Sequence, residues 1–337
     1  MSKIKVAING FGRIGRITLR KLLENEKMDV VAINDITDTK TLAHLFKYDS
    51  VHGRFQGEIK IEDDSLIING NKILVFREEN PSKLPWTYLN IDVVIESTGK
   101  FVTKEAAIVH VEKAGARKVI ISAPAKGESD GVKYIVLGIN DSLIDKNDVI
   151  ISNSSCTTNN VAPLIKILDD NWGIEKGFMT TVHSYTKDQN LLDGPHTDLR
   201  RGRAAAYSIV PTTTGAAKAV TKIFPHLKKN LGGAGIRVPV PDGSLTDLTC
   251  TLSKPACVYE INNAFKEASE TFLKGILEYT EDPIVSRDVI GNTHSAVFDA
   301  GLTAVLGDKN RLVKVVAWYD NEMGYSTRLV ELIEKFN

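Results

Sequence analysis

The sequence is poor in cysteine, and this scarcity limits what its thiols can do. Three cysteines occur in 337 residues, at positions 156, 250 and 257. An odd number cannot all pair in disulfides, and these spacings match no metal-binding template. We therefore expect a reducing, cytoplasmic environment and no bound metal.

Long apolar runs and an excess of charge of one sign are also missing. No run approaches the length of a membrane-spanning helix, and the first residues, MSKIKVAING, resemble a strand rather than a secretory or transit segment. Lys plus Arg and Asp plus Glu number 42 each, which argues against nucleic acid or an anionic membrane as the main partner. The 42% hydrophobic and 25% charged residues are typical of a soluble globular protein, and the length favours two domains.

Short β-branched runs alternate with helical or loop segments in the first half of the chain. This pattern predicts a parallel sheet covered by helices. The runs are KIKVAI (residues 3–8), DVVAIND, IDVVIESTG, KVIISAP, KYIVLGIN and VIISNSS.

After residue 150 the runs become longer and fewer helices separate them, which predicts a mostly antiparallel sheet. Two amphipathic helices are expected, in VYEINNAFKEASETFLKGIL and in STRLVELIEKF. The predicted strands are GFMTTVHSY, GIRVPVP, DLTCTLS, HSAVFDAGLTAVL and RLVKVVAWYD.

A glycine-rich motif, Gly10-Phe11-Gly12-Arg13-Ile14-Gly15, lies between the first predicted strand and a helix. In a dinucleotide-binding fold the first glycine permits a tight turn, the second lets the backbone approach a pyrophosphate, and the third lets helix pack on strand. The N–H groups that begin the helix then face the phosphates. The motif alone also fits an ordinary glycine-rich turn.

Asp35 favours the dinucleotide interpretation, because it ends the second predicted strand 20 residues after Gly15. A carboxylate at this place binds a ribose diol and repels a 2′-phosphate. Residues 36–39 (ITDT) include no arginine that would accept such a phosphate. The sequence therefore predicts an α/β protein with a parallel-sheet Rossmann domain that binds NAD rather than NADP, followed by an α+β domain.

Cys156 lies in SNSSCTTNN (residues 152–160), among hydroxyl and amide side chains, between a strand pattern and an apolar helical pattern. The dipole at a helix start stabilises an anion and lowers the pKa of a thiol. Ser155 and Thr157 supply hydrogen-bond donors, so we expect Cys156 to be a nucleophile. Pro163 must distort this helix or sit near its start.

The other two cysteines have no comparable surroundings. Cys250 alternates with Leu248 and Leu252 on one face of a strand, which predicts core packing. Cys257 follows Lys-Pro-Ala and has no activating neighbour in the sequence.

A thiol nucleophile needs a base, and His183 in TTVHSYT is the best candidate among seven histidines. It ends a predicted strand that follows the cysteine helix, although by itself it resembles a structural histidine. The remaining histidines are expected in loops or on helical surfaces, with solvated or capping roles: His44, His52, His110, His196, His226 and His294.

Seven motifs, in this order and spacing, resemble those of phosphorylating glyceraldehyde-3-phosphate dehydrogenases over essentially the whole chain. They are NGFGRIGR, SSCTTN, TVHSYT, DLRRGRAAA, PTTTGAAKA, RVPVP and WYDNEMGYS. The resemblance implies a glycolytic enzyme that oxidises glyceraldehyde 3-phosphate with NAD and inorganic phosphate to 1,3-bisphosphoglycerate. It also implies that Cys156 forms a hemithioacetal and then a thioester, while His183 takes the thiol proton.

The resemblance further implies contacts to the cofactor and to phosphate groups. Arginine suits phosphate because its guanidinium meets two oxygens at once, whereas Arg200 and Arg203 are expected in a solvated or subunit-contacting loop. The implied cofactor contacts are Gly10, Gly12, Arg13, Ile14, Gly15, Asp35, Ser122 and Asn321. The implied substrate and phosphate contacts are Ser155, Thr157, Thr186, Arg201, Thr214, Gly215 and Arg237.

Three positions depart from the family pattern without removing a catalytic group. Glu79 stands where the family usually has an arginine, so either Arg77 replaces that adenine-side contact or the contact is missing. Met323 replaces a usual aromatic residue, and Asn160 replaces a small residue or cysteine.

The resembled fold has two domains and assembles as a homotetramer. It implies an NAD-binding domain over residues 1–152, completed by a C-terminal helix at about 320–337. The implied catalytic domain covers residues 153–319.

Three alternatives remain open. An erythrose-4-phosphate dehydrogenase shares the cysteine and the histidine, although PTTTGAAKA and Thr186 fit the triose enzyme better. A hydrolytic aldehyde dehydrogenase would have little use for the threonine and arginine set. An NAD-responsive protein whose Cys156 is only a redox sensor would not need His183 and Arg237.

Overall fold

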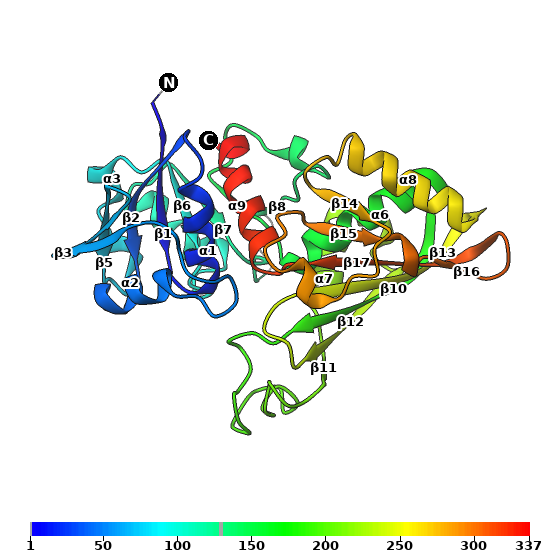
Figure 1. Ribbon diagram of the computed structural model, residues 1–337. Helices are drawn as coiled ribbons and strands as arrows, with labels where there is room; N and C mark the ends of the chain where they lie inside the picture. Colours follow the sequence, from blue (N-terminus) through cyan, green and yellow to red (C-terminus); the bar gives the residue numbers. More distant parts are fainter. Residues whose placement is uncertain (1, 128–130) are drawn as a thin grey trace. The chain divides into compact units, whose positions relative to one another are not determined.

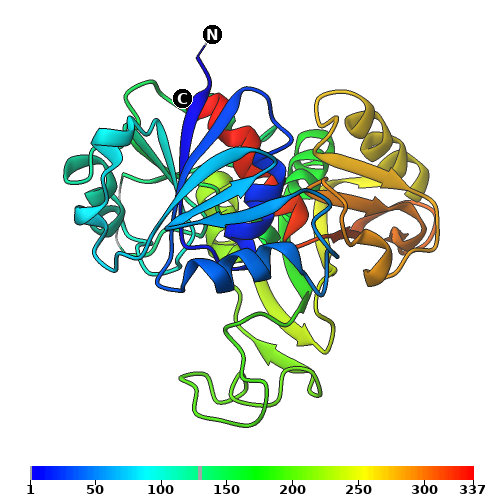
Figure 2. The same cartoon turned by 60° about the vertical axis from the view of Figure 1, so that its left-hand side comes forward.

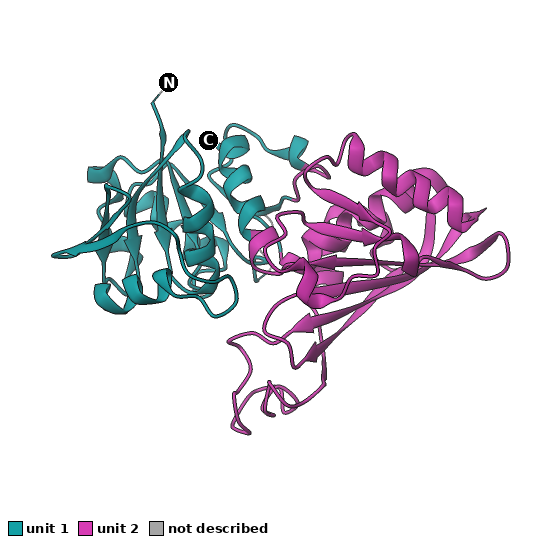
Figure 3. Cartoon of the chain, in the orientation of Figure 1, with its two compact units in different colours: residues 1–135, 141–154, 326–337 teal, residues 136–140, 155–325 magenta. Residues whose placement is uncertain are grey.

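A computed structural model describes residues 2–127 and 131–337 of the chain. The chain folds into two compact units (Figure 3). The first unit comprises residues 1–135, 141–154 and 326–337, and the second comprises residues 136–140 and 155–325.

The first unit is built on a nine-stranded sheet in the order β3-β4-β5-β2-β1-β6-β7-β9-β8. In this order, each neighbouring pair from β5-β2 through β9-β8 is parallel. The pairs β3-β4 and β4-β5 at one edge are antiparallel. The predicted parallel sheet is therefore confirmed, with an antiparallel extension at one edge. The strands span Ile4–Asn9 (β1), Met28–Asn34 (β2), Ile59–Glu62 (β3), Ser65–Ile68 (β4), Asn71–Phe76 (β5), Val93–Glu96 (β6), Lys118–Ile121 (β7), Lys133–Tyr134 (β8) and Ile150–Ser152 (β9).

Helices lie beside this sheet in the first unit (Figures 1 and 2). In α1 the side chains of Ile17, Leu19 and Leu22 are buried, as the helical spacing predicts. One prediction is wrong in part: of KYIVLGIN only Lys133–Tyr134 forms a strand, and turns follow. The α-helices are Arg13–Leu22 (α1), Thr39–Lys47 (α2), Trp86–Leu89 (α3), Lys104–Ala107 (α4) and Val109–Glu112 (α5). The last helix, Met323–Phe336 (α9), belongs to this unit from Ser326 to its end.

The second unit contains an eight-stranded sheet in the order β11-β12-β10-β13-β17-β15-β14, with β16 beside β17. Most pairs are antiparallel, as predicted, but β10-β12 and β14-β15 are parallel. The strands span Ile174–Ser184 (β10), Val210–Thr212 (β11), Leu231–Val238 (β12), Ser244–Ala256 (β13), Leu277–Thr280 (β14), Ala296–Asp299 (β15), Ala304–Val305 (β16) and Asn310–Tyr319 (β17).

Three helices, Cys156–Trp172 (α6), Ala216–Ile223 (α7) and Val258–Glu270 (α8), build the core of this unit with the sheet. Helix α6 contacts β10, β13, β15 and β17. Leu168 of α6 and Leu248 of β13 are fully buried there, and the rings of Phe265 and Phe298 stack at 3.9 Å. Pro163 lies inside α6 rather than at its start, so the helix continues through a position that lacks the N–H donor.

Residues 185–209 connect β10 to β11 without forming a helix or a strand. This segment runs away from the sheet of the second unit (Figures 1 and 2). Across the described residues, no helix combines the length and the apolar character that a membrane crossing requires.

Candidate active site

The glycine-rich turn follows β1 and has the geometry that a dinucleotide turn requires. Gly10 has a φ of +94°, and a Cβ there would lie 2.6 Å from the Thr98 nitrogen. A Cβ on Gly15 would lie 2.2 Å from the Gly10 carbonyl oxygen, whereas a Cβ on Gly12 would meet nothing within 4 Å. Packing therefore excludes side chains at Gly10 and Gly15, and the open backbone at Gly12 fits the close approach of a pyrophosphate.

Asp35 follows β2 and holds this turn in place. Its Oδ2 accepts a hydrogen bond from the Phe11 N–H at 2.8 Å, and its Oδ1 accepts one from the Thr37 N–H at 3.0 Å. Each oxygen keeps a further lone pair, so the carboxylate can still accept from a ribose diol.

Three other expected cofactor residues lie near these strand ends. Ser122 directly follows β7 and is partly exposed, and Ile14 in the first turn of α1 is partly exposed as well. Arg13 is paired with the buried loop residue Asp49, whose Oδ2 lies 2.6 Å from Arg13 Nη1. Arg77 is exposed, and its Nη2 lies 3.3 Å from the Thr39 hydroxyl oxygen and 3.5 Å from Asp64 Oδ1.

Cys156 is the first residue of α6, at the end of a tight strand-to-helix turn. Ser154 in this turn has a φ of +56°, which is rare for a residue with a side chain and marks local strain. Ser155 is the N-cap, and its hydroxyl accepts a hydrogen bond from the Thr158 N–H at 3.1 Å. The turn places the Cys156 sulfur at a helix N-terminus, as the sequence predicts.

His183, near the end of β10, is the base candidate that the structure brings to this thiol. Its Nε2 lies 3.4 Å from Cys156 Sγ. Its Nδ1 lies 2.8 Å from the backbone oxygen of Ser184. The lone pair of Nε2 faces the sulfur and can accept its proton in the tautomer whose ring proton lies on Nδ1 and donates to the Ser184 oxygen.

The pKa of Cys156 does not follow the expectation from the helix start. Burial raises the pKa of the Cys156 thiol, although Arg237 and hydrogen bonds from Thr157 oppose this. Burial, with Arg237 adding to it, lowers the pKa of His183 to about 3. The prediction of a lowered thiol pKa is therefore wrong, and the resting pair is a neutral thiol beside a neutral imidazole.

Arg237 lies next to His183 because the two residues are register partners in the parallel pair β10-β12. Its Nη1 lies 2.7 Å from His183 Nδ1 and 2.9 Å from the Ser184 backbone oxygen. A guanidinium can only donate, so the tautomer with the ring proton on Nδ1 requires Arg237 Nη1 to move off this nitrogen. This register brings the guanidinium of Arg237 to the imidazole of His183. Helix α6 brings the Cys156 thiol to the same imidazole, so all three groups lie together within the second unit.

Arg201 ties the 185–209 segment to the turn before α7. Its Nε donates to the Thr212 hydroxyl at 2.9 Å, and its Nη1 pairs with Asp188 at 2.5 Å. The segment that Arg201 contacts continues into Thr214 and Gly215, and Gly215 is the exposed N-cap of α7.

Of the remaining expected phosphate residues, Thr186 lies two positions beyond β10 and is partly exposed. Arg200 and Arg203 are exposed, as expected, and Arg203 pairs with Asp193 at 2.9 Å.

The sequence analysis missed Tyr319, the last residue of β17. Its hydroxyl lies 2.9 Å from the hydroxyls of both Thr157 and Thr181, and its ring stands edge-on to His183 at 5.9 Å. Burial raises the pKa of Tyr319, so its hydroxyl stays protonated. The sequence signal that could have indicated Tyr319 is its position at the end of a predicted strand, directly before Asp320.

Asn321 belongs to the same unit, and its amide has a defined orientation. Its Oδ1 accepts hydrogen bonds from the hydroxyls of Ser184 at 2.8 Å and Ser244 at 2.7 Å. The amide nitrogen must then point away from both serines, which suits a donor to a ligand oxygen.

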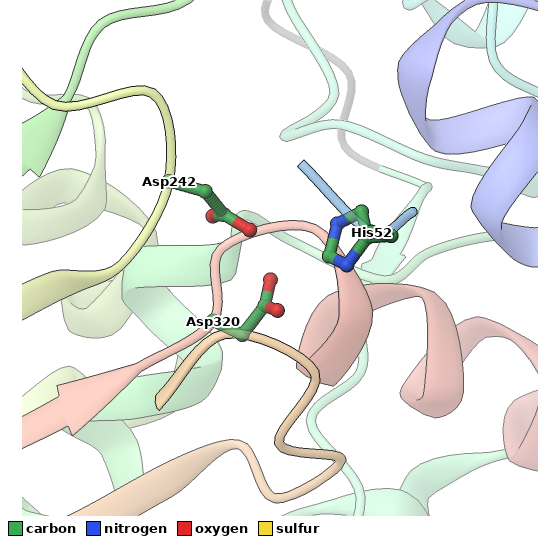
Figure 4. A group of neighbouring side chains, drawn as sticks. All are labelled: His52, Asp242 and Asp320. Carbon is green, nitrogen blue, oxygen red and sulfur yellow. The ribbon is translucent and has the colours of Figure 1, made fainter. Parts of the chain in front are cut away.

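Asp242 and Asp320 form a buried carboxyl pair that the sequence analysis also missed. Their side chains face each other (Figure 4), and both residues are 1% exposed. Burial, with Asp320 and Glu322 adding to it, raises the pKa of Asp242 to about 9. Asp242 is therefore protonated at neutral pH and hydrogen-bonds Asp320.

His110 corrects the expectation for the remaining histidines. It is fully buried and lies 3.1 Å from the buried carboxylate of Glu96, so it is neither solvated nor a cap. The other five are at least partly exposed, as expected: His44, His52, His196, His226 and His294.

The fold of the first unit and the thiol–imidazole pair of the second are the features of a nicotinamide-dependent oxidoreductase that acts through an enzyme thiol. Residues 4–104 match the family model described as glyceraldehyde 3-phosphate dehydrogenase, NAD binding domain. Residues 155–321 match the model of the C-terminal domain of the same family. The chain belongs to the glyceraldehyde-3-phosphate dehydrogenase family, and its cofactor is NAD.

Curated relatives agree over nearly the whole length. The chain is 55% identical over 336 residues to a glyceraldehyde-3-phosphate dehydrogenase of Clostridium pasteurianum, with 98% of each chain covered. It is 53% identical over 332 residues to glyceraldehyde-3-phosphate dehydrogenase 2 of Bacillus subtilis, covering 98% of this chain and 96% of the relative. It is 53% identical over 335 residues to the Clostridium acetobutylicum enzyme, with 98% of each chain covered.

Proposed function

We propose that this chain converts glyceraldehyde 3-phosphate, NAD and inorganic phosphate to 1,3-bisphosphoglycerate, with Cys156 as nucleophile and His183 as base. NAD-dependent oxidation of glyceraldehyde 3-phosphate is the activity of the family to which the chain belongs. The observation that supports the two residue roles is the 3.4 Å separation of Cys156 Sγ and His183 Nε2 at the start of α6.

The first half of the proposed reaction forms a thioester on Cys156. The sulfur attacks the aldehyde carbon, its proton passes to His183 Nε2, and His183 gives that proton to the carbonyl oxygen to complete the hemithioacetal. Bound NAD supplies the acceptor for the hydride of that carbon. His183 takes the hydroxyl proton as the C=O bond forms, which leaves the thioester.

The second half releases the acyl group. An oxygen of inorganic phosphate attacks the thioester carbon, the C–S bond breaks, and the sulfur recovers a proton from His183. The imidazole of His183 is neutral in the resting site. It can therefore accept the proton of the Cys156 thiol in every catalytic cycle. The low pKa of His183, about 3 in the resting site, must rise when the thiolate forms beside it.

The proposed phosphate contacts combine arginines with hydroxyl groups and a helix start. Arg237 lies beside the base, and Arg201 is held at Thr212, next to Thr214 and the N-cap Gly215 of α7. Arginine forks and helix N-termini both bind phosphate oxygens. Ser155, Thr157 and Thr186 complete the proposed set.

We also propose a homotetramer in the cytoplasm. The 185–209 segment exposes large apolar side chains, with Leu199 85% and Tyr207 91% exposed, and such surface favours burial in an assembly. Mass photometry of the purified protein at nanomolar concentration tests the tetramer, and a monomer under these conditions would contradict it.

The decisive experiment measures NADH formation from glyceraldehyde 3-phosphate with and without inorganic phosphate. We expect sustained turnover only with phosphate, and a single burst of NADH per site without it. Equal sustained turnover without phosphate would indicate a hydrolytic enzyme, and a higher kcat/KM for erythrose 4-phosphate would indicate the tetrose enzyme. Absence of any NADH would leave the redox-sensor alternative.

A further inference from the structure

Glu96, the last residue of β6, is a buried carboxylate that the proposed reaction does not use. It is 1% exposed. Its Oε2 accepts a hydrogen bond from Asn9 Nδ2 at 2.6 Å and lies 3.1 Å from His110 Nε2. Its Oε1 accepts from the Thr98 N–H at 2.8 Å and from the Thr98 hydroxyl. All these partners can donate, which is how a buried carboxylate is stabilised.

Trp86 determines where His110 carries its proton. The indole Nε1 of Trp86 can only donate, and it lies 3.1 Å from His110 Nδ1. Nδ1 is therefore an acceptor, the ring proton is on Nε2, and Nε2 donates to Glu96. The ring cannot adopt the other tautomer without opposing two N–H groups.

The carboxylate of Glu96 controls a turn that packs directly on the glycine motif. It holds Thr98 through two hydrogen bonds. The Ser97 hydroxyl donates to the Gly10 carbonyl oxygen at 2.6 Å. Because a Cβ on Gly10 would lie 2.6 Å from the Thr98 nitrogen, residues 97–98 cannot shift toward Gly10 without displacing its backbone.

The same network reaches two further strand ends. Asn34, the last residue of β2, donates from Nδ2 to Asn9 Oδ1 at 2.7 Å and to the Glu78 backbone oxygen at 2.9 Å. The Glu78 N–H donates back to Asn34 Oδ1 at 2.9 Å. The ends of β1, β2 and β6 and the segment after β5 are thus connected through buried side chains.

We infer that Glu96 is a positioning residue for NAD. With Asn9 and His110 it holds the 97–98 turn, and through that turn it keeps the Gly10–Gly15 motif in the shape that receives the pyrophosphate. Its burial keeps Glu96 itself from touching the cofactor. The inference rests on NAD as the cofactor of the family and is independent of the roles proposed for Cys156 and His183.

The test is Glu96→Gln, with NAD affinity measured directly by titration calorimetry. An amide has one acceptor oxygen, so it cannot serve Thr98 on one side and both Asn9 and His110 on the other. Losing charge-assisted hydrogen bonds predicts an NAD Kd raised about tenfold or more. We expect kcat, and the KM for glyceraldehyde 3-phosphate, to stay within about twofold at saturating NAD, because the thiol and its base are unchanged.

Asp92→Asn is the matched control. Asp92 directly precedes β6 at the opposite end of the strand, where it accepts from the Lys5 N–H at 2.8 Å and pairs with Arg117 at 3.2 Å. This change also removes a carboxylate that bonds to the backbone, but it does so far along the strand from the glycine motif. We expect the NAD Kd of this variant to equal that of the unmutated protein.

A second pair of variants separates positioning from folding. A glutamine in His110→Gln can donate to Glu96 and accept from Trp86, so NAD affinity should be largely kept, whereas His110→Phe should bind NAD as weakly as Glu96→Gln.

An unchanged Kd in folded Glu96→Gln, or a fall in kcat with an unchanged Kd, would overturn the inference. If Glu96→Gln does not fold, equal Kd values for the two His110 variants would overturn it. If His110→Phe does not fold either, Ser97→Ala, which removes only a partly exposed hydroxyl, decides it in the same way: a raised Kd supports the inference and an unchanged one overturns it.

Discussion

Arg237 Nη1 and His183 Nδ1 lie 2.7 Å apart, as register partners on the parallel strands β12 and β10. Burial lowers the pKa of His183 to about 3, and the guanidinium adds to this because a cation at this distance disfavours the imidazolium. The same guanidinium is the proposed ligand of inorganic phosphate. A phosphate that draws Arg237 away from the ring would therefore make His183 a stronger base.

Arg237→Gln should affect both properties. We expect the phosphate KM to rise about ten- to a hundred-fold, since a charge-assisted contact is lost. We also expect the pKa of His183 to rise, which NMR titration of the ring can follow. The control is Arg203→Gln in the exposed pair with Asp193, which should change neither quantity. An unaltered phosphate KM would show that Arg237 does not bind phosphate.

Asp35→Ala should weaken NAD binding and narrow the preference for NAD over NADP. The change removes an acceptor for the ribose diol and a charge that repels a 2′-phosphate, and it also releases the Phe11 N–H. Titration of each variant with NAD and with NADP gives the ratio of Kd values. Asp38→Ala is the control, because this nearby carboxylate only caps α2 through Thr41. If the ratio stays constant in Asp35→Ala, the carboxylate does not bind the ribose.

Sub-stoichiometric iodoacetamide should modify Cys156 before the other cysteines. Cys250 is 1% exposed and burial raises its pKa to about 12, and Cys257 caps α8 through the Glu260 N–H at 3.5 Å. Because the pKa of Cys156 is itself raised, its rate of modification should increase with pH between about 6 and 9, since the thiolate is the reacting form. Peptide mass spectrometry at each pH measures both effects.

The matched variants for this experiment are His183→Asn and His226→Asn. The first removes the acceptor of the thiol proton and should slow modification of Cys156 at neutral pH. The second changes an exposed histidine that pairs with Asp169 and should have no effect. Equal modification of all three cysteines in the unmutated protein would refute the assignment of Cys156.

Asp242 should make the protein less stable as pH rises. Its folded pKa of about 9 lies above its ordinary value, so the folded state holds a proton that the unfolded state releases. The stability that this proton contributes is present below the ordinary carboxyl pKa and is lost progressively up to about pH 9, by at most about 1.4 kcal/mol per pH unit.

Asp242→Asn should remove this pH dependence, because the amide can donate to Asp320 at any pH. Thermal melts of both proteins between pH 5 and 9 measure it, and the Tm advantage of the variant should grow with pH. Asp247→Asn, which breaks a half-exposed pair with Lys314, is the control. A Tm difference that stays constant over this range would contradict a buried proton on Asp242.

The parts of the site that could be predicted from the sequence are those that depend on neighbouring residues. Gly10, Gly15 and Asp35 follow from the geometry of one strand, one turn and one helix. The position of Cys156 at a helix start follows from a strand pattern, a polar turn and an apolar helix.

What could not be predicted depends on residues far apart in the chain. The raised pKa of Cys156 results from burial, which periodicity in the surrounding sequence does not reveal. Tyr319 meets Thr157 across 162 positions, and no motif links them. His110 lies on a short helix whose sequence resembles a surface, and only the fold places Glu96 and Trp86 against it.

The parallel pairing of β10 and β12 has a consequence for how activity is acquired. Parallel neighbours cannot be joined by a tight hairpin, so the connection over residues 185–230 must close before His183 and Arg237 can meet. These two residues are 54 positions apart in the sequence. Contacts of such long range form slowly, because the entropy of closing the loop is lost before the contact is gained. A newly synthesised chain should therefore close the contact between Phe11 and Asp35, across 24 positions, before the contact between His183 and Arg237, so that part of the cofactor turn forms ahead of the base.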